Sequence, residues 1–276
     1  MNNIGSVKED LSTENRVSIT PETIKKYIDL GFSINLEKKY AEHLGINDED
    51  YKKNGAKINL TKEEVFQKSD IILKVNSPSS DEISLIKNKS ILIGQFDYDR
   101  NKDLIDKLIK NNVKVFSLNM LPRITRAQSM DVLSSQANLA GYKAVLESFS
   151  KFERAIPMMM TAAGTIPAAK ILVVGAGVAG LQAIATAKRM GAIVFATDVR
   201  AAAKEQVESL GGKFLTVEGY ENLETESGYA KETSAAFKKK QENLLSETLK
   251  KIDIVICTAL IPGKKAPLII KENMIK

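Results

Sequence analysis

Three glycines and one carboxylate have a spacing that could hold a phosphate-bearing ligand. Gly175, Gly177 and Gly180 follow an apolar run typical of a buried strand, and they open an alanine-rich segment typical of a helix. Asp198 ends the next apolar run, 23 positions after Gly175. Glycines permit a tight turn and a close approach of backbone N–H groups to phosphate, and the start of a helix adds positive potential. The arrangement predicts a site for the diphosphate of a dinucleotide.

The carboxylate of Asp198 favours one class of dinucleotide. It would accept hydrogen bonds from the adenosine ribose hydroxyls and repel a 2′-phosphate, so NAD(H) is expected over NADP(H), a preference that nearby Arg200 weakens. The expected cofactor-binding residues are Gly175, Ala176, Gly177, Val178, Ala179, Gly180, Asp198, Val199 and Arg200, followed by Thr258, Ala259 and Leu260 after a later strand. The alternatives are a tight turn without a ligand at the glycines and a plain turn at "IPG".

A second group of polar side chains lies in "RITRAQSMDVLSSQANLAGYKAV", from Arg123 to Val145. On a helix, one face would carry amides, hydroxyls and a single carboxylate, from Gln128, Asp131, Ser135, Asn138 and Tyr142. An ordinary solvated face would be rich in Lys and Glu. The pattern favours a face that binds a ligand, and a polar surface between two domains is the alternative.

The elements around these residues alternate between strand and helix. Before Arg123, apolar runs such as "FSINLEKK", "IILKV" and "ILIGQF" alternate with amphipathic stretches such as "TPETIKKYIDLG" and "NKDLIDKLIKNN". This order predicts an α/β fold with two Rossmann-like, doubly wound parallel-sheet domains. One long helix, starting at Arg123 and ended by Pro157, joins them beside a cleft that holds the nucleotide. The expected domains are 1–137 and 138–276.

Composition excludes several classes of function. The chain has 276 residues, a net charge of +6, one cysteine and one histidine. No cluster of Arg and aromatic residues suggests nucleic acid, and the basic run 238–240 is typical of a solvated helix face. Cys257 lies in an apolar run and is expected in the core, and a chain without disulfides fits a reducing compartment. His43 has no second histidine or cysteine nearby, so we expect no metal site.

Together, three stretches resemble the NAD(H)-binding component of proton-translocating NAD(P) transhydrogenases, in a wider group shared with alanine dehydrogenases. They are "RITRAQSMDVLSSQANLAGY", "VVGAGVAGLQA" with "TDVR", and "CTALIPGKKAP". The N-terminal "ENRVSITPETIKKYIDLGF" belongs to the wider group, and the likeness covers essentially the whole chain.

The resemblance implies roles for the polar stretch. Asp131 and Ser134 would hold the carboxamide or ribose of the dihydronicotinamide, Arg123 would orient that network, and Gln128 would reach toward the partner nucleotide. A mobile loop in the family carries a tyrosine that closes on the nucleotide, and "ESGYAKE" places it at Tyr229 within the polar segment 218–240. A plain surface loop is the alternative for that segment.

The activity implied is direct hydride transfer from NADH to NADP⁺ on a separate component, coupled to proton translocation. The implied partners are a membrane-embedded proton channel, an NADP(H)-binding component and a second copy of the chain. The implied location is the cytoplasm, peripheral on the cytoplasmic face of the inner membrane. An amino-acid dehydrogenase is the first alternative, but alanine dehydrogenases place a catalytic histidine where this chain has Gln95, Phe96 and Asp97.

The family continues beyond "KENMIK" with further strands and a segment that returns to the first domain. A chain without them would leave a sheet edge unprotected. We therefore expect a C-terminally incomplete nucleotide domain that is marginally folded or needs a complementing polypeptide. A non-catalytic fragment of a transhydrogenase is the second alternative.

Overall fold

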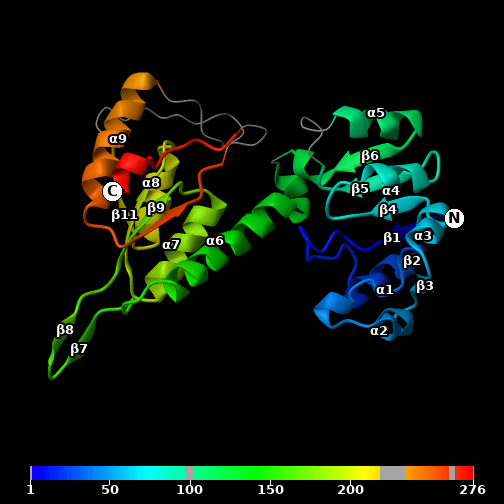
Figure 1. Cartoon of the computed structure of the whole chain (residues 1–276), viewed down its shortest axis with the longest axis horizontal. Coiled ribbons are helices and arrows are strands. Elements are labelled where there is room, and N and C mark those ends of the chain that lie inside the picture. The colour runs from blue at the N-terminus through cyan, green and yellow to red at the C-terminus, as the bar shows by residue number, and fades with distance from the viewer. Residues whose placement is uncertain (1, 97–101, 123, 218–233, 261–264, 276) are drawn as a thin grey trace. The chain divides into compact units, whose positions relative to one another are not determined.

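The computed structural model describes residues 2–96, 102–122, 124–217, 234–260 and 265–275, which fall into two compact units. The first unit is Met1–Asp131 and the second is Val132–Lys276. In Figure 1, colour follows the chain from blue at the N-terminus to red at the C-terminus. Both units are built on parallel sheets, as the alternation of strand and helix patterns predicts. The expected domain boundary near Ala137 stays a prediction.

The first unit contains a six-stranded parallel sheet in the order β3-β2-β1-β4-β5-β6. Its strands are β1 (Asn3–Ser6), β2 (Ser33–Glu37), β3 (Lys57–Asn59), β4 (Ile71–Leu73), β5 (Ile91–Gly94) and β6 (Lys114–Ser117). Its helices are α1 (Pro21–Asp29), η1 (Glu42–Leu44), α2 (Asp48–Lys53), α3 (Lys62–Lys68), α4 (Ser80–Leu85), α5 (Lys102–Lys110), η3 (Leu118–Met120) and η4 (Thr125–Met130).

Helices cover both faces of this sheet because alternate strand residues point to opposite sides. On β4, Ile72 packs into a core that includes side chains of α3, α4 and α5. Its neighbours Ile71 and Leu73 pack against the other core, which includes side chains of α1 and α2. Buried on both faces, the strands are short apolar runs rather than alternating ones.

The expected helix limits in this unit follow local chemistry. Thr20 precedes α1 as its N-cap, Pro21 occupies the first turn, and Gly31 follows the helix with φ +86°. Thr61 caps α3 by accepting a hydrogen bond from the Glu64 N–H at 3.3 Å. These predicted signals are confirmed.

The second unit contains a four-stranded parallel sheet in the order β11-β10-β9-β12 and a separate hairpin. Its strands are β7 (Met159–Thr161), β8 (Gly164–Ile166), β9 (Lys170–Val174), β10 (Ile193–Thr197), β11 (Lys213–Phe214) and β12 (Ile254–Cys257). Its helices are α6 (Val132–Ser150), α7 (Val178–Arg189), α8 (Ala202–Ser209), α9 (Ala235–Leu249) and η5 (Glu272–Met274). Within this unit the β7–β8 hairpin projects away from the sheet (Figure 1).

Alternate residues of the central strand β9 again divide two cores. Ile171 and Val173 pack with side chains of α6, α7 and α8, whereas Leu172 and Val174 pack with Leu245 of α9. The sheet is therefore covered on both faces, and its central strand is buried. This is the doubly wound arrangement expected from the sequence.

The prediction of one helix from Arg123 to Pro157 is wrong. Among the described residues, η4 ends at Met130, Asp131 has ψ 82°, and α6 runs only from Val132 to Ser150. Short polar side chains such as Ser129 and Asp131 compete for backbone hydrogen bonds and favour a break. Gln128 and Asp131 therefore do not share a helix face with the residues of α6.

Two further expectations are corrected in the second unit. The segment 218–240 was expected to be a loop, but α9 begins at Ala235, where Ser234 caps it by accepting from the Phe237 N–H at 3.2 Å. Cys257 is exposed rather than buried, because β12 carries alternately buried and exposed side chains. The lysines 238–240 are exposed on α9, as predicted. In the part of the chain that is described, no helix combines the length and apolarity needed to cross a bilayer.

Candidate functional site

The glycine loop follows β9 and begins α7. Gly175 has φ +97°, a left-handed conformation that side chains disfavour. A Cβ at Gly180 would lie 1.8 Å from the carbonyl oxygen of Gly175, so only glycine allows the helix to pack so closely on the loop. The first and third glycines thus do what the motif predicts, one at the turn and one at the helix–strand contact.

The end of β12 is joined to this loop. The Thr258 hydroxyl donates a hydrogen bond to the Gly175 carbonyl at 2.7 Å, and a Cβ on Gly175 would lie 2.9 Å from the Ala259 nitrogen. In the order β11-β10-β9-β12, the direction of winding reverses between β9 and β12. Ligands of doubly wound sheets bind beyond the carboxyl ends of the strands at such a reversal.

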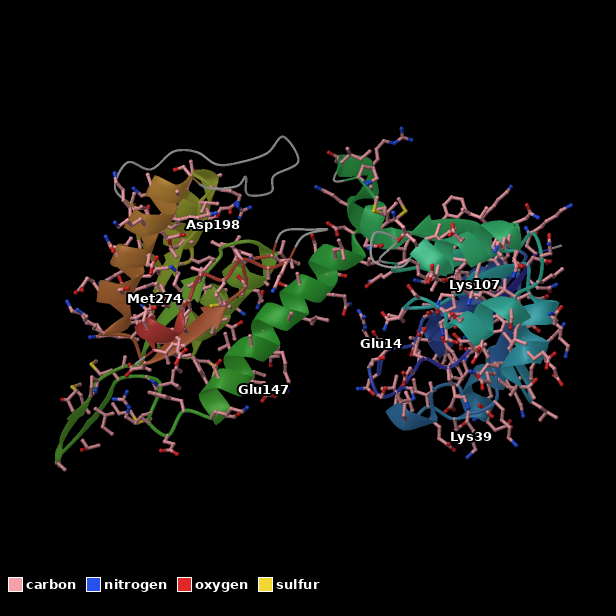
Figure 2. The ribbon with its side chains drawn as sticks, turned by 45° about the horizontal axis from the view of Figure 1, so that its top comes forward. Glu14, Lys39, Lys107, Glu147, Asp198 and Met274 are labelled. Atoms are coloured by element: carbon pink, nitrogen blue, oxygen red, sulfur yellow. The ribbon has the colours of Figure 1, made fainter. Side chains whose placement is uncertain are left out.

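Asp198 (labelled in Figure 2) stands at the carboxyl end of β10, and its carboxylate is tied to the glycine loop. It accepts a hydrogen bond from the Ala176 N–H at 2.7 Å and forms an ion pair with Arg200 at 2.9 Å. Burial alone would raise the pKa of Asp198. The guanidinium of Arg200 and the surrounding N–H groups outweigh burial and hold that pKa below its ordinary value. The carboxylate is therefore charged at neutral pH.

The start of α7 offers free donors for an anion. Gly177 is its N-cap and supplies no side-chain hydrogen bond to the first turn, so the side chain that usually satisfies those N–H groups is missing. A Cβ at Gly177 would have Arg200 Nη2, at 3.9 Å, as its one neighbour within 4 Å. The loop thus combines an uncapped start of a twelve-residue helix with open space in front of it.

Helix α6 supports this loop through a residue that the motif does not include. A Cβ at Gly141 would lie 2.0 Å from the Ala179 carbonyl oxygen, in the first turn of α7. Val145 and Phe149, on the same face of α6, are buried in the core shared with α7. The signal in the sequence is a lone glycine inside an alanine-rich helix, which costs helix stability unless close packing requires it.

The structure brings together some expected site residues and leaves others apart. The glycine loop, Asp198, Arg200 and Thr258 meet at the carboxyl ends of β9, β10 and β12, with Val178 and Leu260 exposed beside them. Ser134 lies in the first turn of α6, in the second unit. Gln128 and Asp131 belong to the first unit, where the Asp131 N–H donates to the Gln128 carbonyl at 3.2 Å. Arg123 and Tyr229 lie outside the described residues.

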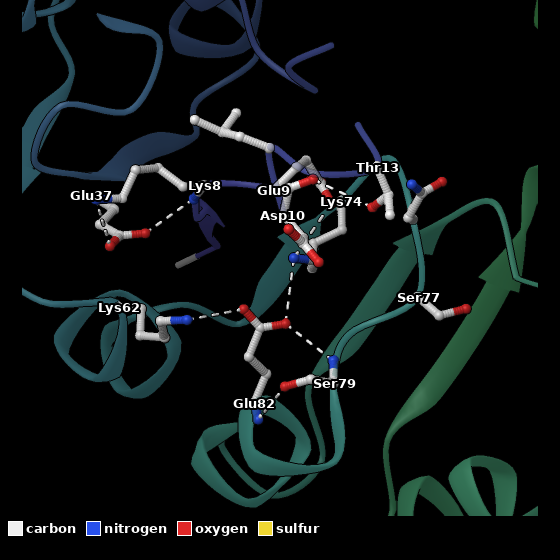
Figure 3. A pocket seen from close by; sticks show the side chains of 12 residues that line it. Lys8, Glu9, Asp10, Thr13, Glu37, Lys62, Lys74, Ser77, Ser79 and Glu82 are labelled. Atoms are coloured by element: carbon white, nitrogen blue, oxygen red, sulfur yellow. Dashed lines mark hydrogen bonds and ion pairs between the residues drawn. The ribbon is translucent and has the colours of Figure 1, made fainter. Parts of the chain in front are cut away.

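A second cavity of about 590 Å³ lies in the first unit (Figure 3). Its lining includes residues that follow β1 and β4. Each lysine that lines it contacts a carboxylate of the same cavity: Lys8 pairs with Glu37, Lys62 with Glu82, and Lys74 with both Glu9 and Glu82. Because these cations are already neutralised, we assign no ligand to this cavity.

Comparison with known proteins agrees with the glycine-loop site. Residues 5–140 match the family model "Alanine dehydrogenase/PNT, N-terminal domain", and residues 144–276 match "Alanine dehydrogenase/PNT, C-terminal domain". The first of the chains that make up the NAD(P) transhydrogenase alpha subunit of Rhodospirillum rubrum is 49% identical over 275 residues, which cover 97% of this chain and 72% of that protein.

A solved structure and a second relative separate two groups within the family. The crystal structure of a transhydrogenase from Sinorhizobium meliloti has a TM-score of 0.86 and 45% identity, covering 99% of this chain and 74% of that one. An alanine dehydrogenase of Methanococcus maripaludis is only 26% identical, over 99% of this chain and 68% of its own. The chain therefore belongs to the alanine dehydrogenase/PNT family, in its group of NAD(P) transhydrogenase alpha subunits.

Proposed function

We propose that this chain is the NAD(H)-binding component of a proton-translocating NAD(P) transhydrogenase. The observation that carries the proposal is the glycine loop, whose uncapped helix start and buried carboxylate stand side by side at the winding reversal of the sheet. The helix start suits a diphosphate, and Asp198 suits ribose hydroxyls. The identity of 49% to a transhydrogenase alpha subunit supports the choice of family group.

Within this proposal, the chain positions a nicotinamide and needs no proton donor of its own. NADH, when bound, supplies a hydride that passes directly to NADP⁺ on a separate component. The chain's task is then to orient the ring and exclude water. We assign contacts with the carboxamide or ribose to Asp131 and Ser134, their orientation to Arg123, and the approach to the partner nucleotide to Gln128.

The proposed assembly follows from the same assignment. We propose a homodimer at the cytoplasmic face of the inner membrane, working with a membrane-embedded proton channel and an NADP(H)-binding component. The Rhodospirillum rubrum relative is named as one portion of an alpha subunit, which supports a complex of several chains. We further propose that Tyr229 belongs to a loop that closes over the nucleotide.

The site favours this function over an amino-acid dehydrogenase. A dehydrogenase must move a proton as well as a hydride and usually keeps a histidine or lysine for it. The only histidine of the chain, His43, shares a hydrogen bond of 2.8 Å with the Asn15 carbonyl in the first unit. The position after β5, where alanine dehydrogenases resembling this chain carry their histidine, holds a buried Phe96.

Titration with NADH, followed by nucleotide fluorescence, tests the proposal. We expect saturable binding, weakened about tenfold to a hundredfold in Asp198→Ala, since hydrogen bonds to a charged acceptor contribute about 1.5–3 kcal/mol. The matched control is Asp253→Ala. Asp253 is ion-paired with Arg154 and accepts from the Lys170 N–H at the opposite edge of the same sheet, so its loss should leave NADH binding unchanged.

An activity assay separates the proposal from its alternatives. With the NADP(H)-binding component added, we expect reduction of an NADP⁺ analogue by NADH. Oxidation of NADH by pyruvate and ammonia would instead support the dehydrogenase. Absence of NADH binding would support the non-catalytic fragment.

A further inference from the structure

The side chain of Arg200 covers the carboxylate that is proposed to bind the adenosine ribose. Oδ1 of Asp198 accepts from the Arg200 backbone N–H at 2.9 Å and from its Nε at 3.0 Å. Oδ2 accepts from the Ala176 N–H at 2.7 Å and from Arg200 Nη2 at 2.9 Å. A carboxylate offers about four acceptor positions. All four are filled by donors from the chain itself.

These four donors fall into two pairs. The Ala176 and Arg200 backbone N–H groups are fixed by the glycine loop and by the turn after β10. The other two, Nε and Nη2, belong to a side chain that can rotate away. Each oxygen of Asp198 thus has one fixed donor and one removable donor. A ribose presents two neighbouring hydroxyl groups, which match the two removable donors in number and in spacing across the carboxylate.

We propose that the Arg200 guanidinium is a built-in substitute for the ribose diol, displaced when NAD(H) binds, and that Arg200 thereby sets the preference between NADH and NADPH. This inference rests on the proposed function. The substitution keeps Asp198 paired in the free protein, where its side chain is 7% exposed and that of Arg200 is 18% exposed. An unpaired carboxylate at this depth would be strongly destabilising.

The position of the guanidinium gives the displaced side chain a second role. Arg200 Nη2 lies 3.9 Å from where a Cβ of Gly177 would be, so the guanidinium lies over the glycine loop. After displacement it stays tethered two residues from Asp198, beside the ribose. An arginine there can pair with a 2′-phosphate that the carboxylate would otherwise repel. Arg200 therefore reduces the discrimination against NADPH that Asp198 alone would impose.

Two substitutions of Arg200 separate its charge from its shape. Arg200→Met removes the charge and the donors but keeps the apolar stem, and Arg200→Lys keeps the charge but loses the fork of donors. We expect the ratio of the NADPH and NADH dissociation constants to rise about tenfold in Arg200→Met and to change less than about threefold in Arg200→Lys, because a 2′-phosphate depends on a nearby cation. Arg154→Met, which removes the partner of Asp253, should leave the ratio unchanged. An unchanged ratio in Arg200→Met would refute the specificity role.

Displacement itself is measured by NMR of arginine side chains. In the free protein the Arg200 Nε–H is hydrogen-bonded to Asp198 at 3.0 Å and should give a protected signal, identified by its absence in Arg200→Lys. Saturating NADH should shift this signal to the position of a solvated arginine. If NADH binds and the signal does not move, the displacement is wrong and the proposed function stands. If NADH does not bind at all, the proposed function fails and this inference fails with it.

Discussion

At the scale of single residues, the candidate site depends on positions where one atom decides the outcome. Gly175 and Gly180 admit no Cβ without a backbone shift, and Asp198 joins the glycine loop to the end of β10. Their types and spacing made this region of the site predictable from sequence. The pairing of Arg200 with Asp198 was not predictable, because it depends on which rotamer a long side chain adopts after folding.

Acidification should test the charge of Asp198. Its pKa in the folded protein lies below the ordinary 3.8, so its ionisation stabilises the fold above that pH, and the stabilisation is lost as the pH falls through the lowered pKa. Asp198→Asn should lower the free energy of unfolding by about 1–3 kcal/mol at neutral pH. The difference from the wild type should shrink below about pH 4.

Urea titrations from about pH 7 to about pH 2.5, a range that spans the ordinary pKa of an aspartate, measure this difference. If the curves for the two proteins stay parallel down to the lowest pH at which both are folded, the Asp198 carboxylate does not contribute as stated.

At the scale of elements, the contact between α6 and α7 holds the glycine loop in place. Gly141 is the point of closest approach, and the Cβ that it lacks would meet backbone rather than a movable side chain. The sequence predicted a helix here but not its limits, because the break at Asp131 depends on local polar side chains that also occur inside helices. Strand β1 also escaped prediction, since "NIGS" has few apolar residues, and Gly5 is needed only because Ser69 packs on it.

Substitution of Gly141 tests the contact. Gly→Ala inside a helix ordinarily stabilises a protein by about 0.5–1 kcal/mol. Here Gly141→Ala should destabilise the second unit by about 1–3 kcal/mol, the usual cost of overpacking, and should weaken NADH binding because Ala179 belongs to the first turn of α7.

Thermal unfolding and NADH titration of this variant are the measurements. The matched control is Ala140→Gly at the exposed neighbouring position, which should cost about 1 kcal/mol of helix propensity and leave NADH binding unchanged. A Gly141→Ala protein that is more stable than the wild type would show that α6 does not touch the loop as described.

At the scale of the whole molecule, the two units use one winding plan. The order β11-β10-β9-β12 corresponds to the first four strands of β3-β2-β1-β4-β5-β6, so each unit has a reversal of winding beside its first strand. Sequence patterns predicted this plan, because parallel strands buried on both faces give apolar runs separated by amphipathic helices. They could not show which reversal binds a ligand. In the first unit, the lysines around the cavity are neutralised by carboxylates far apart in the sequence.

A crystal structure of the chain with bound NADH tests the central claim most directly. The account predicts the diphosphate about 3 Å from the N–H groups that begin α7, after Gly177, with the adenosine ribose on Asp198. A diphosphate bound elsewhere, such as beside Lys74 in the cavity of the first unit, would contradict it.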